Sequence, residues 1–117
     1  MKLIDIINRH YESSSSVTEH YKRAKRDFVK TLQLYFGKES VIVTSCPHFE
    51  FTGFIKKLDK FVYFATGDLR YRICNSMLVR TARHEKDYTG GHNQSVSYMD
   101  EDFDNSFRIM INKLLDN

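Results

Sequence analysis

The spacing of apolar residues changes twice along this chain, and that change restricts the fold more than any other feature. Apolar residues recur every three or four positions from Val17 to Tyr35, as on the buried side of a helix. Between residues 40 and 84 they alternate instead, in a stretch rich in the Val, Ile, Phe, Tyr and Thr that favour strands. The helical spacing returns from Phe103 to Leu114. We therefore expect an α+β fold, in which helices cover one face of an antiparallel sheet.

The pattern predicts helices over residues 2–12, 17–36 and 103–114. It predicts strands over residues 40–46, 49–58, 61–66, 69–74 and 77–84, with a short further strand at 95–98 after a flexible loop at 87–94. Pro47 makes the first of these segments either an edge strand or a lead-in to the sheet. The expectation is one domain over residues 1–117, with a sheet of four or five strands and two or three helices packed on one face.

Composition limits the cellular setting and the chemistry. The chain is 41% apolar and 28% charged, which suits a globular domain with one core. No apolar run approaches the length of about 18 residues that a membrane span needs, and charge interrupts the first five residues. We expect a soluble cytoplasmic protein without membrane contact, in which Cys46 and Cys74 stay reduced and buried. The histidine and cysteine spacings fit no zinc site, so we expect neither metal nor cofactor.

Charge is distributed unevenly along the chain. Residues 17–86 hold fourteen Lys or Arg and seven Asp or Glu, whereas residues 87–117 hold two and six. The outer side of the helix at 17–36 carries Lys22, Arg26 and Lys30 at four-residue intervals, with Arg23 beside them. Like charges at this spacing oppose the helix by about 0.2–0.5 kcal/mol per pair, and Glu19 and Asp27 relieve mainly Arg23. The pattern predicts an anionic partner, but a solvated face or neutralisation by the acidic C-terminal segment explains it nearly as well.

One face of the sheet combines aromatic and basic residues if Asp59-Lys60 and Gly67-Asp68 are two-residue turns. Ile55 then lies opposite Phe64 on an apolar face that the helices cover. The other face receives Phe54, Lys56, Leu58, Phe61, Tyr63, Ala65, Arg70 and Arg72. Such a face suits stacking of single-stranded bases and contact with phosphates, and it equally suits a protein interface. Alternatively, a second layer covers it and its aromatic side chains are core.

These observations favour a small non-enzymatic protein that binds nucleic acid, single-stranded more than duplex. The predicted binding residues are Lys22, Arg23, Arg26, Lys30, Lys56, Phe61, Tyr63, Arg70 and Arg72. The alternative is a compact inhibitor or adaptor that docks on another protein through the same surface. A metal-independent ribonuclease is a third, weaker hypothesis, in which Arg83, His84, Glu85 and His92 supply the acid, the base and a cation. We recognise no family signature in the chain.

Overall fold

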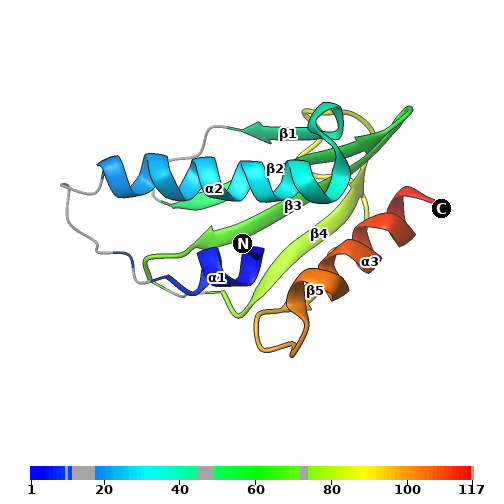
Figure 1. Cartoon of the computed structure of the whole chain (residues 1–117). Helices are drawn as coiled ribbons and strands as arrows, with labels where there is room; N and C mark the ends of the chain where they lie inside the picture. Colours follow the sequence, from blue (N-terminus) through cyan, green and yellow to red (C-terminus); the bar gives the residue numbers. More distant parts are fainter. Residues whose placement is uncertain (10, 12–17, 45–48, 72–73, 117) are drawn as a thin grey trace.

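The computed structural model describes residues 1–9, 11, 18–44, 49–71 and 74–116, and its sheet is antiparallel with strand order β1-β2-β3-β4-β5. The strands are β1 (Val41–Thr44), β2 (Glu50–Lys57), β3 (Lys60–Asp68), β4 (Ser76–Ala82) and β5 (Gln94–Ser97). Helices α1 (Leu3–Ile7), α2 (Thr18–Phe36) and α3 (Phe103–Leu115) lie on one face of the sheet, and a short 3₁₀ turn, Lys38–Ser40, leads into β1 (Figure 1). The α+β prediction is confirmed.

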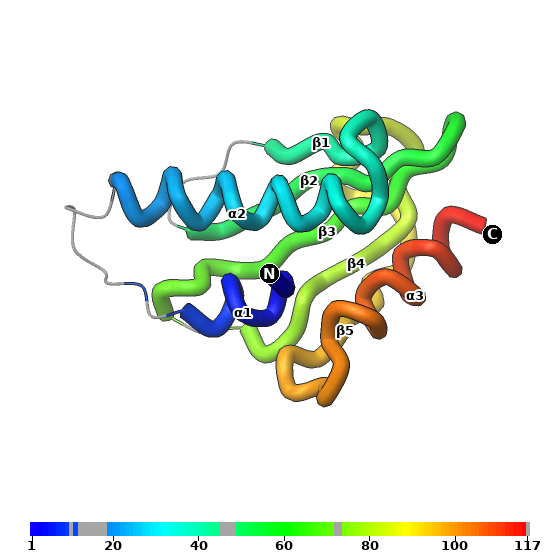
Figure 2. The backbone as a smooth tube through the Cα atoms, in the orientation of Figure 1, coloured from blue at the N-terminus to red at the C-terminus, as the bar shows by residue number. Residues whose placement is uncertain are grey.

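Helix α2 forms where the sequence predicts it, because its apolar positions face the sheet. Ala24, Phe28 and Leu32 have no exposed surface, and they follow one another at intervals of four residues. The helix ends at Gly37, whose φ of 93° favours glycine and whose amide donates to the carbonyl of Gln33 at 2.8 Å. This helix crosses the sheet on the β1 side, whereas α3 lies on the β4 side (Figure 2).

Helix α1 is shorter than predicted. It ends at Ile7 instead of continuing to residue 12, so the predicted range is wrong for the described residues that follow. Tyr11 is nevertheless buried, because its hydroxyl donates to the carbonyl of Ile6 at 2.6 Å and its ring contacts Phe49. The apolar spacing therefore predicted the burial of Tyr11 correctly, although Tyr11 does not belong to a helix.

The hairpin between β2 and β3 turns one residue earlier than predicted. Lys57 pairs with Lys60, so the turn is Leu58-Asp59, and Leu58 has a positive φ of 57°. Ile55 consequently lies opposite Val62 and not opposite Phe64. The register differs by two residues, and an even shift keeps every side chain on its predicted face.

The predicted strand at residues 69–74 is wrong in its described part. Strand β3 continues to Asp68, and β4 pairs directly with β3, which places Arg80 opposite Tyr63. Leu69 to Tyr71 form a turn, in which the amide of Arg70 donates to Asp68 Oδ1 at 3.0 Å and the amide of Tyr71 donates to the Asp68 carbonyl at 3.3 Å. An aspartate that captures the amide two residues later competes with strand pairing, which explains the turn.

The face of the sheet toward the helices carries the core. Its buried side chains are Phe51, Ile55, Val62, Phe64, Met77, Val79 and Val96. Phe28 of α2 stacks on Phe51 with ring centroids 5.0 Å apart, and Phe107 of α3 meets Phe64 edge to face. This packing of aromatic rings fixes the helices on the sheet.

A single buried carboxylate links the three helices. Asp104 of α3 accepts hydrogen bonds from the amides of Leu3 at 2.7 Å and Ile4 at 3.0 Å, and from the hydroxyl of Tyr35 on α2. These amides are at the start of α1 and have no partner within that helix. Asp104 therefore caps α1.

Two further expectations concern the molecule as a whole. Within the described ranges, none of the helices has both the length and the apolar character needed to cross a membrane. Cys74 is a free thiol and is exposed, so its predicted burial is wrong, and the described residues before it, Leu69 to Tyr71, form a turn in place of the predicted strand. Cys46 lies outside the described residues.

Candidate functional site

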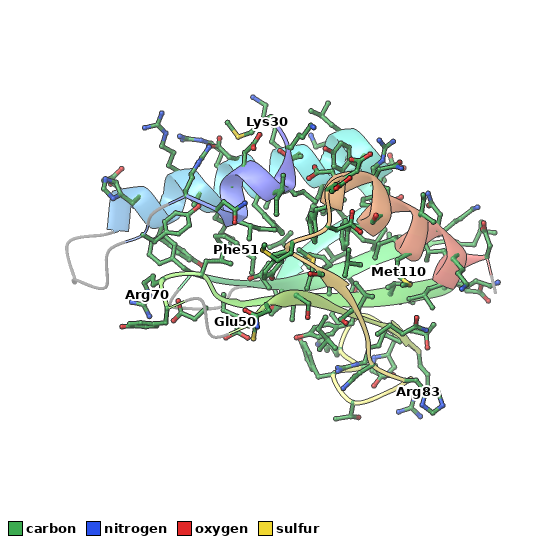
Figure 3. All side chains as sticks on the ribbon, turned by 90° about the horizontal axis from the view of Figure 1, so that it is seen from below. Lys30, Glu50, Phe51, Arg70, Arg83 and Met110 are labelled. Carbon is green, nitrogen blue, oxygen red and sulfur yellow. The ribbon has the colours of Figure 1, made fainter. Side chains whose placement is uncertain are left out.

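The predicted binding residues that the structure describes lie on different sides of the molecule. Figure 3 shows Lys30 on α2 pointing away from the sheet, while the segment with Arg83 lies beyond the other face. Lys22, Arg23 and Arg26 share the α2 side. Lys56, Phe61 and Tyr63 belong to the sheet face that the helices leave uncovered. The structure therefore does not bring the helix and sheet residues into one surface.

The outer side of α2 is a continuous basic surface, which we call the α2 basic face. It consists of Lys22, Lys25, Arg26 and Lys30, which line a shallow depression together with Val29 and Gln33. Lys22, Arg26 and Lys30 are exposed, and none of the four cations makes an ion pair or side-chain hydrogen bond with a described residue. Lys25 was missed in the sequence, although it precedes Val29 by one turn and so belongs to the same surface.

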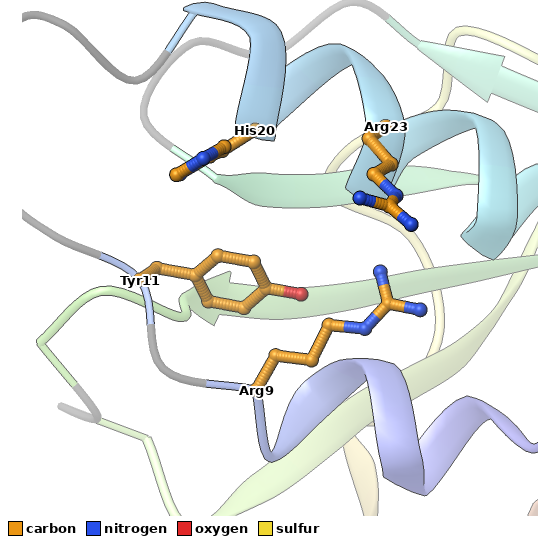
Figure 4. A pocket seen from close by; sticks show the side chains of 4 residues that line it. All are labelled: Arg9, Tyr11, His20 and Arg23. Atoms are coloured by element: carbon orange, nitrogen blue, oxygen red, sulfur yellow. The ribbon is translucent and has the colours of Figure 1, made fainter.

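A pocket adjoins this face where the chain leaves α1. It is lined by Arg9, Tyr11, His20 and Arg23, and the two guanidinium groups face each other across it (Figure 4). Arg9 pairs with Asp27 at 2.9 Å, so Asp27 neutralises Arg9 and not Arg23 as expected. Arg23 has no ion-pair partner in the described part of the chain. Nothing in the sequence marked Arg9, because the contact between α1 and α2 creates the pocket.

Burial shapes the chemistry of Tyr11 at the base of this pocket. Its ring is only 6% exposed, and burial raises the pKa of its phenol, which the charge of the neighbouring Arg9 partly opposes. Tyr11 is therefore a neutral part of the pocket lining, and its hydroxyl proton is already donated to the Ile6 carbonyl.

The sheet face on the other side is partly covered. Phe54 has no exposed surface, Tyr63 is 9% exposed, and the ring of Tyr88 packs on both with centroids 5.7 and 5.8 Å away. The Arg80 guanidinium lies 4.4 Å from the centroid of the Tyr63 ring. Lys56 and Phe61 are half-buried. The expectation of an open aromatic face is wrong at its centre, because the segment between β4 and β5 lies over it (Figure 3).

Asp87 organises this covering segment. Its carboxylate accepts hydrogen bonds from the amides of Arg83 at 2.9 Å, Thr89 at 3.2 Å and Gly90 at 2.9 Å. These bonds, the one from the Arg83 amide first, hold the pKa of Asp87 well below its usual range, although burial opposes them. A Cβ on Gly90 would clash with Asp87 Oδ2, so a larger residue there would displace the carboxylate from these bonds. The loop expected to be flexible is thus tied to one carboxylate.

Arg70 is engaged at the end of β3. Its guanidinium binds Asp68 through Nε at 3.1 Å and through a terminal nitrogen at 2.8 Å, and it also lies over the ring of Tyr71. A guanidinium held this way offers few donors to a phosphate. Arg72, its predicted companion, lies outside the described residues.

The ribonuclease residues lie on the covering segment. Arg83, His84, Glu85 and His92 are all exposed. The Arg83 side chain pairs with Asp87 at 3.2 Å, and His84 Nδ1 accepts the amide of Lys86 at 3.2 Å. The cation that this hypothesis needs for the phosphate therefore already has a carboxylate partner.

Comparison with known proteins gives no match to a family model, a curated protein or a solved structure. Function must therefore be argued from the surfaces described above.

Proposed function

We propose that the protein binds the phosphate backbone of nucleic acid along the α2 basic face. The supporting observation is that four cations lie on one side of a helix without an acidic partner in the described part of the chain. From Lys22 to Lys30 the helix rises by about 12 Å, so these cations form a row that a charged strand can follow. Cations that contact phosphates release condensed counterions, which supplies affinity independent of base sequence.

The sheet face has no part in this proposal. The preference for single strands depended on bases stacking on exposed aromatic rings, and Phe54 and Tyr63 are buried beneath Tyr88. The α2 basic face offers phosphate contacts that single strands and duplexes share. A titration with both kinds of nucleic acid therefore decides between single strands and duplexes.

The test is a fluorescence-anisotropy titration with labelled single-stranded and duplex RNA and DNA. We expect binding that weakens steeply between about 50 and about 200 mM salt. Replacing Lys22, Arg26 and Lys30 together with glutamine should lower the log–log salt slope by about 2, since each lost phosphate contact removes roughly 0.7–0.9.

The control variant replaces Lys38, Lys86 and Lys113 with glutamine. These lysines are exposed outside the α2 basic face, so the control loses the same charge as the test variant. The control variant should keep most of the salt slope of the wild-type protein. Absence of binding at low salt, or equal losses in the two variants, would overturn the proposal.

A second candidate is an inhibitor or adaptor that docks on another protein through the sheet face. The observation favouring it is Arg80, which is 8% exposed and whose Nε has no hydrogen-bond partner among the described residues. A buried guanidinium without a carboxylate is costly, and an acidic group from a partner would compensate it. A partner captured after nuclease treatment and at high salt, and lost with Arg80→Gln, would favour this candidate.

We also propose that the protein acts in the cytoplasm. An exposed free thiol such as that of Cys74 is typical of a reducing compartment. A tagged protein recovered in a secreted or membrane fraction would contradict this.

A further inference from the structure

The pocket between α1 and α2 differs in shape from the α2 basic face beside it. It is a hollow of about 330 Å³ with walls from two separate segments, one that follows α1 and one in the first turns of α2. Arg9 and Tyr11 form one wall, and His20 and Arg23 form the other (Figure 4). A group that enters is contacted from both sides, whereas a strand on the open helix face is contacted from one.

The charge in the pocket is not balanced by the described residues. Arg9 is held in place by Asp27 at 2.9 Å, and Arg23 approaches from the opposite side without an ion-pair partner among the residues that the structure describes. Two guanidinium groups and one carboxylate leave an excess of positive charge. Guanidinium groups bind phosphate oxygens through paired hydrogen bonds, so an oxyanion of phosphorus matches both the charge and the donor geometry.

The position of the pocket indicates which phosphate of a nucleic-acid strand it would bind. Arg23 lies one helical turn before Arg26 on α2, so the pocket lies beside the N-terminal part of the row of cations. A phosphate within a strand is esterified on both sides and carries one negative charge, whereas a terminal phosphate has three free oxygens and a charge of about −1.5 to −2 near neutral pH. A terminal group has one more free oxygen and about one more negative charge to share between the two walls, and its chain leaves the pocket in one direction only.

We propose that this pocket binds the terminal phosphate monoester of a nucleic-acid strand that lies along the α2 basic face. The inference rests on the proposed function and adds to it recognition of a strand end. It makes Arg9 and Arg23 the residues that distinguish phosphorylated from unphosphorylated ends.

The experiment compares three labelled oligonucleotides of one sequence, with a 5′-phosphate, with a 3′-phosphate and with neither. We expect one phosphorylated form to bind the wild-type protein about tenfold more tightly than the unphosphorylated form, as one charged hydrogen-bonded contact gives. Arg23→Gln should remove this preference. Arg26→Gln, which deletes the same charge on the α2 basic face outside the pocket, should weaken binding of all three and keep their ratio.

A measurement without mutation guards against altered folding. In NMR spectra of the wild-type protein, the Nε–H signals of Arg9 and Arg23 should shift with the preferred phosphorylated strand and not with the unphosphorylated one. Equal binding of all three oligonucleotides would overturn this inference and leave the proposed function standing. Failure of every oligonucleotide to bind at low salt would overturn both, and loss of the preference in Arg26→Gln as large as in Arg23→Gln would overturn the pocket assignment.

Discussion

At the scale of single residues, Asp104 contributes most to the arrangement of the helices. It is 5% exposed and accepts the amides of Leu3 and Ile4 as well as the hydroxyl of Tyr35. Asp104→Asn should lower the free energy of unfolding by about 2–3 kcal/mol, because hydrogen bonds to a charged acceptor are lost and an amide NH₂ cannot accept. Urea denaturation measures this. Asp102→Asn is the control, since Asp102 is exposed and makes no side-chain cap; equal losses would contradict the prediction.

Tyr35 makes stability depend on alkaline pH. Burial, followed by its hydrogen bond to Asp104, raises the pKa of Tyr35 to about 12 from 10.0. Between these two values the folded state keeps a proton that the unfolded state loses, so stability is intact below about pH 10 and falls as the pH rises toward 12. Tyr35→Phe should show a shallower fall over that window in denaturant titrations. Parallel curves for the two proteins would show that Tyr35 contributes nothing there.

At the scale of elements, sequence pattern predicted the faces of the sheet better than its strands. Alternation placed Phe54 and Tyr63 on the same face of the sheet, and they share that face in the structure although the predicted register was wrong by two residues. The same alternation predicted a strand at residues 69–74, but the described residues Leu69 to Tyr71 form a turn. Alternation reports only local compatibility with a strand, whereas Asp68 binds the amide and guanidinium of Arg70 and turns the chain. The predicted two-residue turn at Gly67-Asp68 is wrong, because both residues belong to β3 and the connection to β4 begins at Leu69.

The segment between β4 and β5 gives a prediction at this scale. Asp87 accepts hydrogen bonds from the amides of Arg83, Thr89 and Gly90, and these bonds keep its pKa low. The stability that they contribute is therefore complete above the ordinary aspartate range and is lost as pH falls below it toward the lowered pKa. Asp87→Asn should speed hydrogen exchange at these amides and increase exposure of Tyr63, seen as greater binding of a hydrophobic dye. Glu85→Gln, exposed in the same segment, should leave exchange unchanged. Unaltered exchange in Asp87→Asn would show that other contacts hold the segment.

At the scale of the whole molecule, the candidate site was only half predictable. Helical spacing located Lys22, Arg26 and Lys30 correctly on one exposed face, because it is a local property of one helix. The pocket with Arg9 and the covering of Phe54 by Tyr88 depend on contacts between different elements, and the periodicity within one element does not encode them.

The placement of helix and sheet surfaces on opposite sides gives the last prediction. The molecule measures 41 × 29 × 26 Å, so a strand bound along α2 reaches the sheet face only by wrapping around an edge. Lys56→Gln, Phe61→Ala and Arg70→Gln, combined in one protein, should therefore leave nucleic-acid affinity and its salt slope as in wild type. We expect the Arg70 change to have little effect on binding, because the Arg70 guanidinium is already paired with Asp68. A slope reduced by about 1 for each removed cation would instead show that the sheet face contacts phosphates, and the strand would then have to span both surfaces.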